Sequence, residues 1–346
     1  HPLNRSPIGT GPYRFHSWKT NESIRIIRNE EYWGTKPEIR EIAFEVIAED
    51  TVALQVLKKG GLDFAGLRPI QWVKQTGSRH FNEQFQKMKY STPGYSFIGW
   101  NNKSPYFADK RVRKAMTFLV NRKELMEKVN FGLGEITTGP FYTDSPDYDR
   151  SIIPIPYDPA EAKRLLAEAG WKDTDGDGLL DRDGRPFRFE FLIPSGRRFA
   201  ELLSTILKED LSKMGIDVKI RKLEWAVFVK TLDERKFDAV TLGWVFGFDQ
   251  DPYQVWHSSQ AEKGSNFVGF RDKEADHLIE MGRREFDRGK RAHLYQEFHK
   301  LIDEEQPYSF LFANASLLAL DRRFENVTVY PTGVDPLEWR LRPSLQ

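Results

Sequence analysis

The order of apolar and polar positions predicts an α/β sheet in the second half of the chain. Apolar residues alternate along 187–193, 216–223 and 238–245, and between these segments they recur at helical spacing over 199–214 and 225–235. The segments therefore follow one another as strand, helix, strand, helix and strand with short connections. This order predicts a parallel sheet, because each helix carries the chain back to the edge where the next strand begins.

The pattern differs on either side of this sheet. The first hundred residues predict mostly strands and turns, with strands at 13–18, 23–28, 42–47 and 95–100 and one short helix at 51–58. Side chains that accept hydrogen bonds from backbone N–H groups predict further helix starts, at Asp109, Asn121, Asp158 and Asp287. A long apolar strand pair is expected over 310–320.

Composition and charge exclude several classes of protein. The 346 residues carry 52 Lys and Arg against 51 Asp and Glu, a net charge of +1, which provides no bulk attraction for nucleic acid or an anionic membrane. There is no cysteine, so disulfide scaffolds, iron–sulfur clusters and thiol nucleophiles are excluded. No apolar run approaches the 18 residues or so that would span a bilayer. The composition is that of a globular protein with about two domains.

Motifs for catalysis are missing from the sequence. It contains no phosphate-binding P-loop, dinucleotide fingerprint, Gly-x-Ser-x-Gly nucleophile turn or His-Glu-x-x-His zinc helix, and its seven histidines are scattered. An α/β hydrolase stays open only as the weaker alternative, because no nucleophile and base can be paired. We therefore expect no enzyme activity and no cofactor.

A ligand site is expected where the three parallel strands end, since ligands of such sheets bind beyond the carboxyl ends of the strands. The three loops there are Pro194–Gly196, which contains Ser195, Glu224–Trp225, and Phe246–Pro252. Trp225 and Trp244 either line this edge or pack in the core.

Charged residues of the same loops suggest what the edge could bind. Asp249 and Asp251 would fix a cationic ligand group or cap turns, and they are too close in sequence to act as a glycosidase pair. Arg197 and Arg198 begin a helix, where a carboxylate could bind, although solvated surface is the alternative for both.

One loop resembles a calcium site. Asp173, Asp175, Asp177 and Asp181 match positions 1, 3, 5 and 9 of a calcium-binding loop, but position 12 is Gly184 where a glutamate is needed. A tight polar turn is the alternative, and we expect no metal unless this weak candidate holds calcium.

Several segments together resemble the bacterial extracellular solute-binding proteins of family 5, the oligopeptide, dipeptide and nickel receptors of ABC importers. The resemblance runs in order along essentially the whole chain. The matching segments are Pro7–Tyr13 (PIGTGPY), Arg28–Trp33 (RNEEYW), Gly60–Phe64 (GGLDF), Phe107–Ala115 (FADKRVRKA), Asn121–Lys123 (NRK), Ala160–Trp171, Leu211–Val218, Glu224–Trp225, Phe237–Ala239, Gly243–Trp244 and Asp251–Pro252.

The resemblance implies a two-lobed periplasmic-binding-protein fold that closes on an extended peptide without covalent chemistry and delivers it to membrane permease subunits. It implies a monomer at the cell envelope, periplasmic or extracellular. Receptors of the same family for nickel, haem or an oligosaccharide are the alternatives. A nickel carrier would want a histidine pair, and only His257 lies near the expected site.

Site residues carry over only where this sequence matches the family. Trp225 and Trp244 match aromatic positions near the ligand, and Tyr95 and Phe97 are weaker candidates. The family's acidic residue, which pairs with the ligand's N-terminal ammonium, would fall at Gly247 or Phe248, so that Asp249 is the nearest carboxylate. This departure puts a peptide with a free amino group in doubt.

The resemblance also implies a division of the chain. Lobe 1 would hold residues 1–102, partial and rich in strands, together with 311–346, and lobe 2 would hold 103–310. The chain resembles the C-terminal two-thirds of such proteins, without the first part of lobe 1 and the extra subdomain. For a chain of this extent we expect weak or no ligand binding and an exposed apolar patch.

Overall fold

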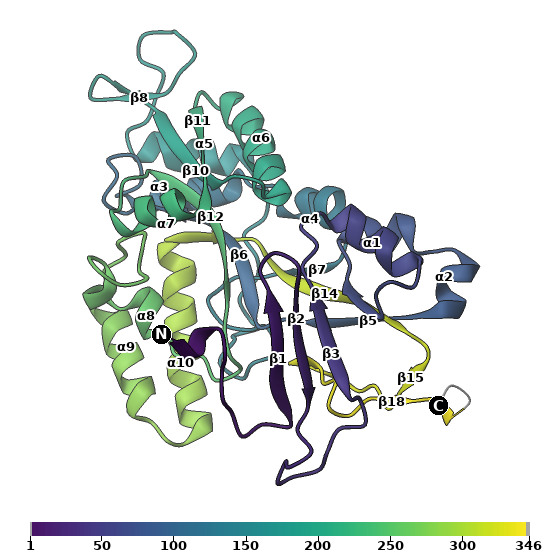
Figure 1. Ribbon diagram of the computed structural model, residues 1–346. Coiled ribbons are helices and arrows are strands. Elements are labelled where there is room, and N and C mark those ends of the chain that lie inside the picture. The colour runs from purple at the N-terminus through teal and green to yellow at the C-terminus, as the bar shows by residue number, and fades with distance from the viewer. Residues whose placement is uncertain (1, 344–346) are drawn as a thin grey trace. The chain divides into compact units, whose positions relative to one another are not determined.

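The computed structural model describes residues 2–343, which form two compact units (Figure 1). The larger unit holds residues 93–314, and the smaller unit holds 2–92 and 315–343. The boundary expected from the sequence lay at 102/103. Strand β6 (Gly94–Trp100) instead belongs to the larger unit, because it pairs with β12 (Ala239–Val245) on one side and β13 (Tyr308–Phe310) on the other.

The larger unit contains a mixed sheet and most of the helices. Its remaining strands are β7 (Gly134–Ile136), β8 (Asp181–Arg182), β9 (Arg185–Pro186), β10 (Arg188–Pro194) and β11 (Asp217–Leu223). Its helices are α3 (Lys110–Phe118), α4 (Arg122–Asn130), α5 (Pro159–Glu168), α6 (Arg198–Ser212), α7 (Trp225–Asp233), α8 (Tyr253–Trp256), the 3-10 turn η3 (Ser258–Gln260), α9 (Lys273–Arg284) and α10 (Arg288–Glu305).

The strand order of the main sheet is β11-β10-β12-β6-β13. Strand β10 is parallel to both β11 and β12, which confirms the parallel sheet expected from the alternating segments. Strands β6 and β13 complete the sheet in antiparallel pairing. Because β10, β11 and β12 run in one direction, their carboxyl ends lie at the same edge.

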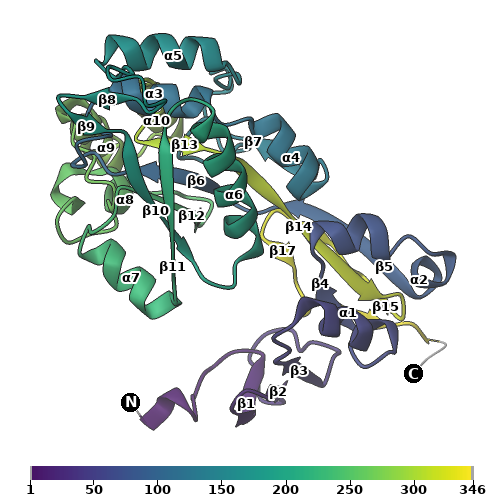
Figure 2. The same cartoon turned by 90° about the horizontal axis from the view of Figure 1, so that it is seen from above.

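Each face of this sheet buries a separate apolar core, and alternate residues of a strand enter opposite cores. Ile98 and Trp100 of β6 pack with α3, α4, α5 and α6, whereas Tyr95 and Phe97 pack with α7, α8, α9 and α10. Figure 2 shows helices on both sides of the strands. The sheet is thus a middle layer between two helical layers.

The helix starts read from the sequence are confirmed by side-chain caps. The carboxylate of Asp109 accepts a hydrogen bond from the N–H of Arg111, and that of Asp287 accepts one from Lys290. Asn121 and Asp158 cap α4 and α5 in the same way. Each cap satisfies a backbone donor that the first helical turn leaves unpaired.

The smaller unit is built mainly from antiparallel strands. Its helical segments are η1 (Pro2–Asn4), α1 (Asp50–Lys58), the π-helical turn η2 (Gln71–Gln75) and α2 (Arg79–Gln84), of which α2 was not expected. Its strands are β1 (Tyr13–Lys19), β2 (Ser23–Arg28), β3 (Glu41–Glu45), β4 (Phe64–Gly66), β5 (Phe85–Ser91), β14 (Phe312–Asp321) from Ala315 onward, β15 (Phe324–Glu325), β16 (Val329–Tyr330), β17 (Gly333–Val334) and β18 (Arg340–Leu341).

Two sheets organise the smaller unit, β1-β2-β3 and one in which β14 pairs with β4 and β5. On the first sheet Trp18, Ile24 and Phe44 lie opposite one another on adjacent strands, and Trp18 and Phe44 are 41% and 53% exposed. An apolar row of this sheet therefore faces solvent in the structure. Among the described residues, no helix is both long enough and apolar enough to cross a membrane.

Candidate ligand-binding site

The ends of the parallel strands bring the predicted loops to one edge of the larger unit. Strands β10 and β11 end in register at Pro194 and Leu223, and the N–H of Ser195 donates to the carbonyl of Leu223 at 2.7 Å. The first loop is therefore joined by a backbone hydrogen bond to the last residue of β11, directly before the second loop. Ser195 and Arg197 are both exposed there, and the Arg197 side chain makes no cap at the start of α6.

Strand β12 continues past the end of its neighbour and leaves one edge open. Its pairing with β10 includes Leu192 and Val240, whereas its pairing with β6 extends to Val245. In an antiparallel ladder, alternate residues direct their N–H and C=O groups to the partner strand. The N–H of Phe246 bonds to the carbonyl of Pro93, so the intervening position at Val245 directs its backbone groups away from β6.

The same alternation applies two residues earlier, at Gly243. Both Gly243 and Val245 are exposed, and the Val245 side chain is 75% exposed. Their outward N–H and C=O groups have no described strand beside them, since β10 has ended. This short open edge offers donors and acceptors spaced as in a β-ladder.

The two tryptophans expected near the site lie in different surroundings. Trp225, the first residue of α7, is 51% exposed and stacks on Phe228 with ring centres 5.7 Å apart. Trp244 is half-buried between the rings of Phe97 and Phe267, with centres 6.4 and 5.9 Å away. Trp225 is thus open to a ligand, whereas Trp244 mainly packs against the second core.

Tyr95 and Phe97, the weaker candidates, lie in that core, at 3% and 1% exposure. Phe97 stacks on Tyr308 with ring centres 3.8 Å apart. Burial raises the pKa of Tyr95 well above its usual value, so its hydroxyl stays protonated. In this structure the two side chains pack in the second apolar core and are too buried to contact a ligand.

The loop that follows β12, Phe246–Pro252, is called the β12 loop, and each of its two carboxylates is paired with an arginine. Oδ1 of Asp249 lies 2.8 Å from Nη2 of Arg291, and Oδ2 of Asp251 lies 3.0 Å from Nε of Arg283. Asp251 also accepts a hydrogen bond from the N–H of Tyr253, which starts α8. Asp251 therefore caps a turn, and the cationic groups that the two carboxylates bind in this structure are arginines of the chain itself.

The arginines themselves gave no signal in the sequence. Arg283 and Arg291 lie on α9 and α10, more than thirty positions beyond the loop, in segments that read as ordinary amphipathic helices. Gln250 was missed as well: it is 5% exposed, and its side-chain oxygen accepts a hydrogen bond from the N–H of Tyr142. Only the folded chain brings these groups to the strand ends.

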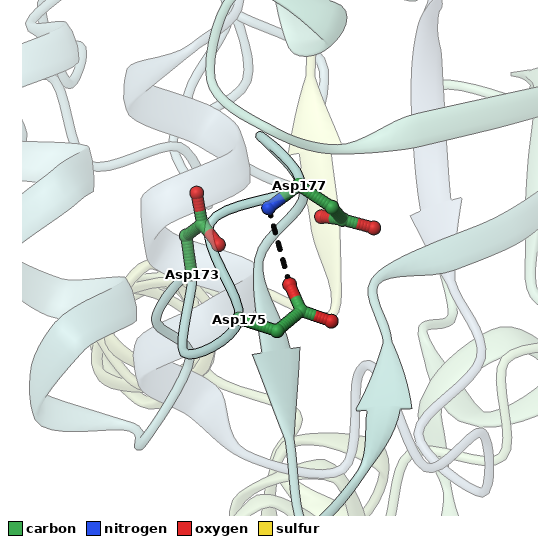
Figure 3. Close-up of side chains that lie close together, drawn as sticks. All are labelled: Asp173, Asp175 and Asp177. Atoms are coloured by element: carbon green, nitrogen blue, oxygen red, sulfur yellow. Dashed lines mark hydrogen bonds between the residues drawn. The ribbon is translucent and has the colours of Figure 1, made fainter.

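The acidic loop between α5 and β8 lies apart from these residues along the chain. Its side chains Asp173, Asp175 and Asp177 lie close together (Figure 3). Carboxylate oxygens of Asp173, Asp175 and Asp177 lie within 4.8 Å of one another, and all three side chains are exposed. Asp173 accepts hydrogen bonds from the N–H groups of Gly176 and Gly178.

The fourth candidate of this loop is used differently. The Asp181 carboxylate accepts hydrogen bonds from both the N–H and the hydroxyl of Thr174. The hydrogen bonds of the loop are those of a tight polar turn, in which carboxylates satisfy backbone donors. Three of the four predicted side chains converge, and the fourth stabilises the turn.

Comparison with known proteins identifies the family to which this chain belongs. Residues 1–266 match the family described as "Bacterial extracellular solute-binding proteins, family 5 Middle". The chain is 33% identical over 334 residues to the oligopeptide-binding protein AppA of Bacillus subtilis (strain 168), and the match covers 94% of this chain and 60% of AppA. It is 27% identical over 347 residues to the dipeptide-binding protein of Escherichia coli (strain K12), covering 97% and 60%. The chain thus spans about 60% of the length of these curated relatives.

Solved structures agree. The structure of AppA from Bacillus subtilis in complex with a nonapeptide superimposes with a TM-score of 0.85 at 32% identity, covering 97% of this chain and 67% of that one. NikZ from Campylobacter jejuni in complex with Ni(L-His) has the same fold, with a TM-score of 0.83 at 24% identity and coverages of 98% and 69%. The chain therefore belongs to the bacterial extracellular solute-binding proteins of family 5 and has their α/β fold.

Proposed function

We propose that the protein containing this chain is the substrate-binding component of an ABC importer for peptides. In this proposal it captures an extended peptide, in the periplasm or outside the cell, and hands it to membrane permease subunits without changing it chemically. The observation that carries the proposal is the open edge of β12, where Gly243 and Val245 direct backbone groups outward. The relationship to oligopeptide-binding AppA supports it.

An open strand end suits a ligand recognised through its main chain. An extended peptide adds to such an edge as a further strand, and main-chain hydrogen bonds then provide affinity that does not depend on the peptide's sequence. The exposed ring of Trp225 at the same edge offers an apolar contact for whichever side chain lies next to it. This combination favours a broad range of peptides over one particular sequence.

A nickel ligand is the second candidate, because NikZ shares the fold. Near the strand ends the relevant histidine is His257, whose Nδ1 accepts a hydrogen bond from the N–H of Ser259. Among residues 2–343, the one group of His, Asp or Glu side chains close enough to share a metal ion is the loop of Asp173, Asp175 and Asp177. The strand-end edge therefore favours peptide over metal.

Native mass spectrometry tests the proposed function. The longest natural polypeptide that contains these 346 residues should carry extra masses of several hundred daltons after gentle purification, and it should lose them on denaturation. The same measurement on the 346-residue chain would show whether the strand-end edge alone retains peptide. A bare protein that also ignores an added peptide mixture would contradict the proposal.

The open edge can be tested by one pair of substitutions. Val245→Pro removes the outward N–H while leaving the pairing with β6 intact, because proline is tolerated where the N–H of a strand faces outward. The loss of one main-chain hydrogen bond should weaken peptide binding about five- to tenfold. Val245→Ala keeps the donor and should bind peptide nearly as the wild type does. Calorimetric titration with one peptide decides between them, and equal affinities for both variants would exclude the edge as the docking strand.

A further inference from the structure

Arg291 forms an ion pair with Asp249, the carboxylate nearest to the position expected to bind a ligand's amino terminus. Its guanidinium lies 2.8 Å from Asp249, whose side chain is 76% exposed, while the Arg291 side chain is only 26% exposed. The Asp249 carboxylate is thus at the surface, and it is paired with a more buried arginine of helix α10. A ligand ammonium approaching the β12 loop meets a charge that is already paired.

A second carboxylate, that of Asp147, is influenced by the charge of Arg291. Asp147 is 4% exposed, and no described Lys, Arg or His nitrogen forms an ion pair with it. Burial raises the pKa of Asp147, and the positive charge of Arg291 acts in the opposite direction. An ionised carboxylate in such a place needs a nearby cation. Arg291 is therefore paired directly with Asp249, and the buried Asp147 carboxylate adds a further attraction.

The helix beneath fixes the position of this arginine. Arg291 lies in the first turn and a half of α10, and one turn further on Tyr295 is 2% exposed and stacks on Phe141. The segment that contains Asp147 is tied to the same helix, since the Gln296 amide donates to the carbonyl of Pro146 at 2.8 Å. Moving Arg291 away from Asp249 would thus require changes in packed structure, whereas Asp249 stands on an exposed loop.

We propose that Arg291 is a specificity-determining residue that masks Asp249, so that this receptor does not require a free amino terminus on its peptide. The inference rests on the proposed peptide-binding function and names its substrate class. Peptides whose amino group is blocked bind about as well as those whose amino group is free. Affinity then comes from the main-chain edge and not from an ammonium–carboxylate pair.

Paired ligands test the inference: an alanine-rich pentapeptide with a free amino terminus and its N-acetylated twin, each titrated calorimetrically. For the wild type the two dissociation constants should agree within about threefold. Arg291→Met keeps the apolar stem but unmasks Asp249, and the free peptide should then bind about tenfold or more tightly than the acetylated one, the factor of one charge-assisted hydrogen bond. Arg291→Lys keeps the positive charge and should behave as the wild type.

Two further variants control the test. Arg288→Met removes an exposed positive charge from the same helix and should leave the ratio of the two constants unchanged. Asp249→Asn, at an exposed position that folding tolerates, should also leave it unchanged, because a masked carboxylate contributes no preference.

The outcomes separate the inference from the proposed function. A wild type that prefers the free peptide about tenfold or more, an Arg291→Met protein with the wild-type ratio, or a large loss of free-peptide affinity in Asp249→Asn would each overturn the masking while peptide binding stands. If the wild type binds neither peptide nor any peptide mixture, the proposed function fails and the inference falls with it.

Discussion

Replacing Arg113 by methionine should lower the free energy of unfolding of the larger unit by about 3–5 kcal/mol, the cost of removing one partner from a buried charged network. Arg113 lies on α3 and is 3% exposed. Its guanidinium donates to the carbonyl of Phe107 at 2.9 Å and of Ala108 at 3.0 Å, and to that of Glu305 at 2.7 and 3.0 Å. Methionine fills a similar volume but leaves these carbonyls without a donor.

The size of this effect follows from where the carbonyls lie. Glu305 is the last residue of α10, and its carbonyl belongs to the helix end that has no donor within the helix. Burial lowers the pKa of Arg113 to about 10, and the Glu305 carboxylate opposes that shift, so the guanidinium remains charged at neutral pH. One side chain thus joins the start of α3 to the end of α10.

Native-state hydrogen exchange, followed by mass spectrometry on peptides from α3 and α10, measures this loss within the larger unit. Arg113→Lys should lie between the wild type and Arg113→Met, because an ammonium keeps the charge but not the planar fork. Arg111→Met is the matched control, since Arg111 lies two positions before Arg113 on the same helix, is exposed, and pairs with Asp109 at the surface. Equal protection in Arg113→Met and Arg111→Met would show that the buried network contributes little.

Periodicity predicted the parallel strands of the larger unit because apolar residues recur along them at regular spacing, and it predicted the helices between them because those helices are amphipathic. Strand β6 was expected as a strand within residues 1–102, whereas it pairs with strands of the larger unit. Its partners β12 and β13 lie more than 130 positions away, and pairing across such separations leaves no local signal.

The sequence predicted which loops follow the ends of the parallel strands, but not the contacts that their side chains make. The strand-end edge follows from topology alone, and the loops containing Ser195, Trp225 and Asp249 do meet it. The open edge of β12 depends on where β10 stops, which no pattern reports. The pairing of Asp249 with Arg291 likewise depends on how α10 packs, so the sequence could offer only a free carboxylate.

Two titratable residues one turn apart on α10 should give the larger unit opposite pH dependences. His299 is fully buried; its Nδ1 accepts a hydrogen bond from the N–H of Asp149, so its proton is on Nε2, which faces the hydroxyl of Thr138 at 3.1 Å. Burial lowers the pKa of His299 from 6.5 to about 4. Burial raises the pKa of Asp303 from 3.8 to about 6.

The signs follow from which state binds more protons. Between pH 6.5 and 4 the unfolded chain protonates His299 and the folded chain does not, so stability falls by about 3 kcal/mol as the pH is lowered through this range. Between pH 6 and 3.8 the folded chain holds a proton on Asp303 that the unfolded chain has released, so stability rises by a similar amount as the pH is lowered. In the wild type these two contributions largely cancel.

Substituting His299 or Asp303 alone should therefore reveal the pH dependence of stability that cancels in the wild type. His299→Gln should gain stability from pH 6 to pH 4 relative to the wild type, and Asp303→Asn should lose it, each by about 2 kcal/mol when hydrogen exchange of α10 peptides is measured across that range. His293→Gln removes an exposed histidine from the same helix and should follow the wild-type profile. Parallel profiles for wild type and His299→Gln would mean that His299 is charged in the folded protein. Arg291 lies on the same helix. Measuring the ratio of affinities for free and acetylated peptide in His299→Gln and Asp303→Asn therefore shows whether a change of stability in the C-terminal half of α10 alters that ratio.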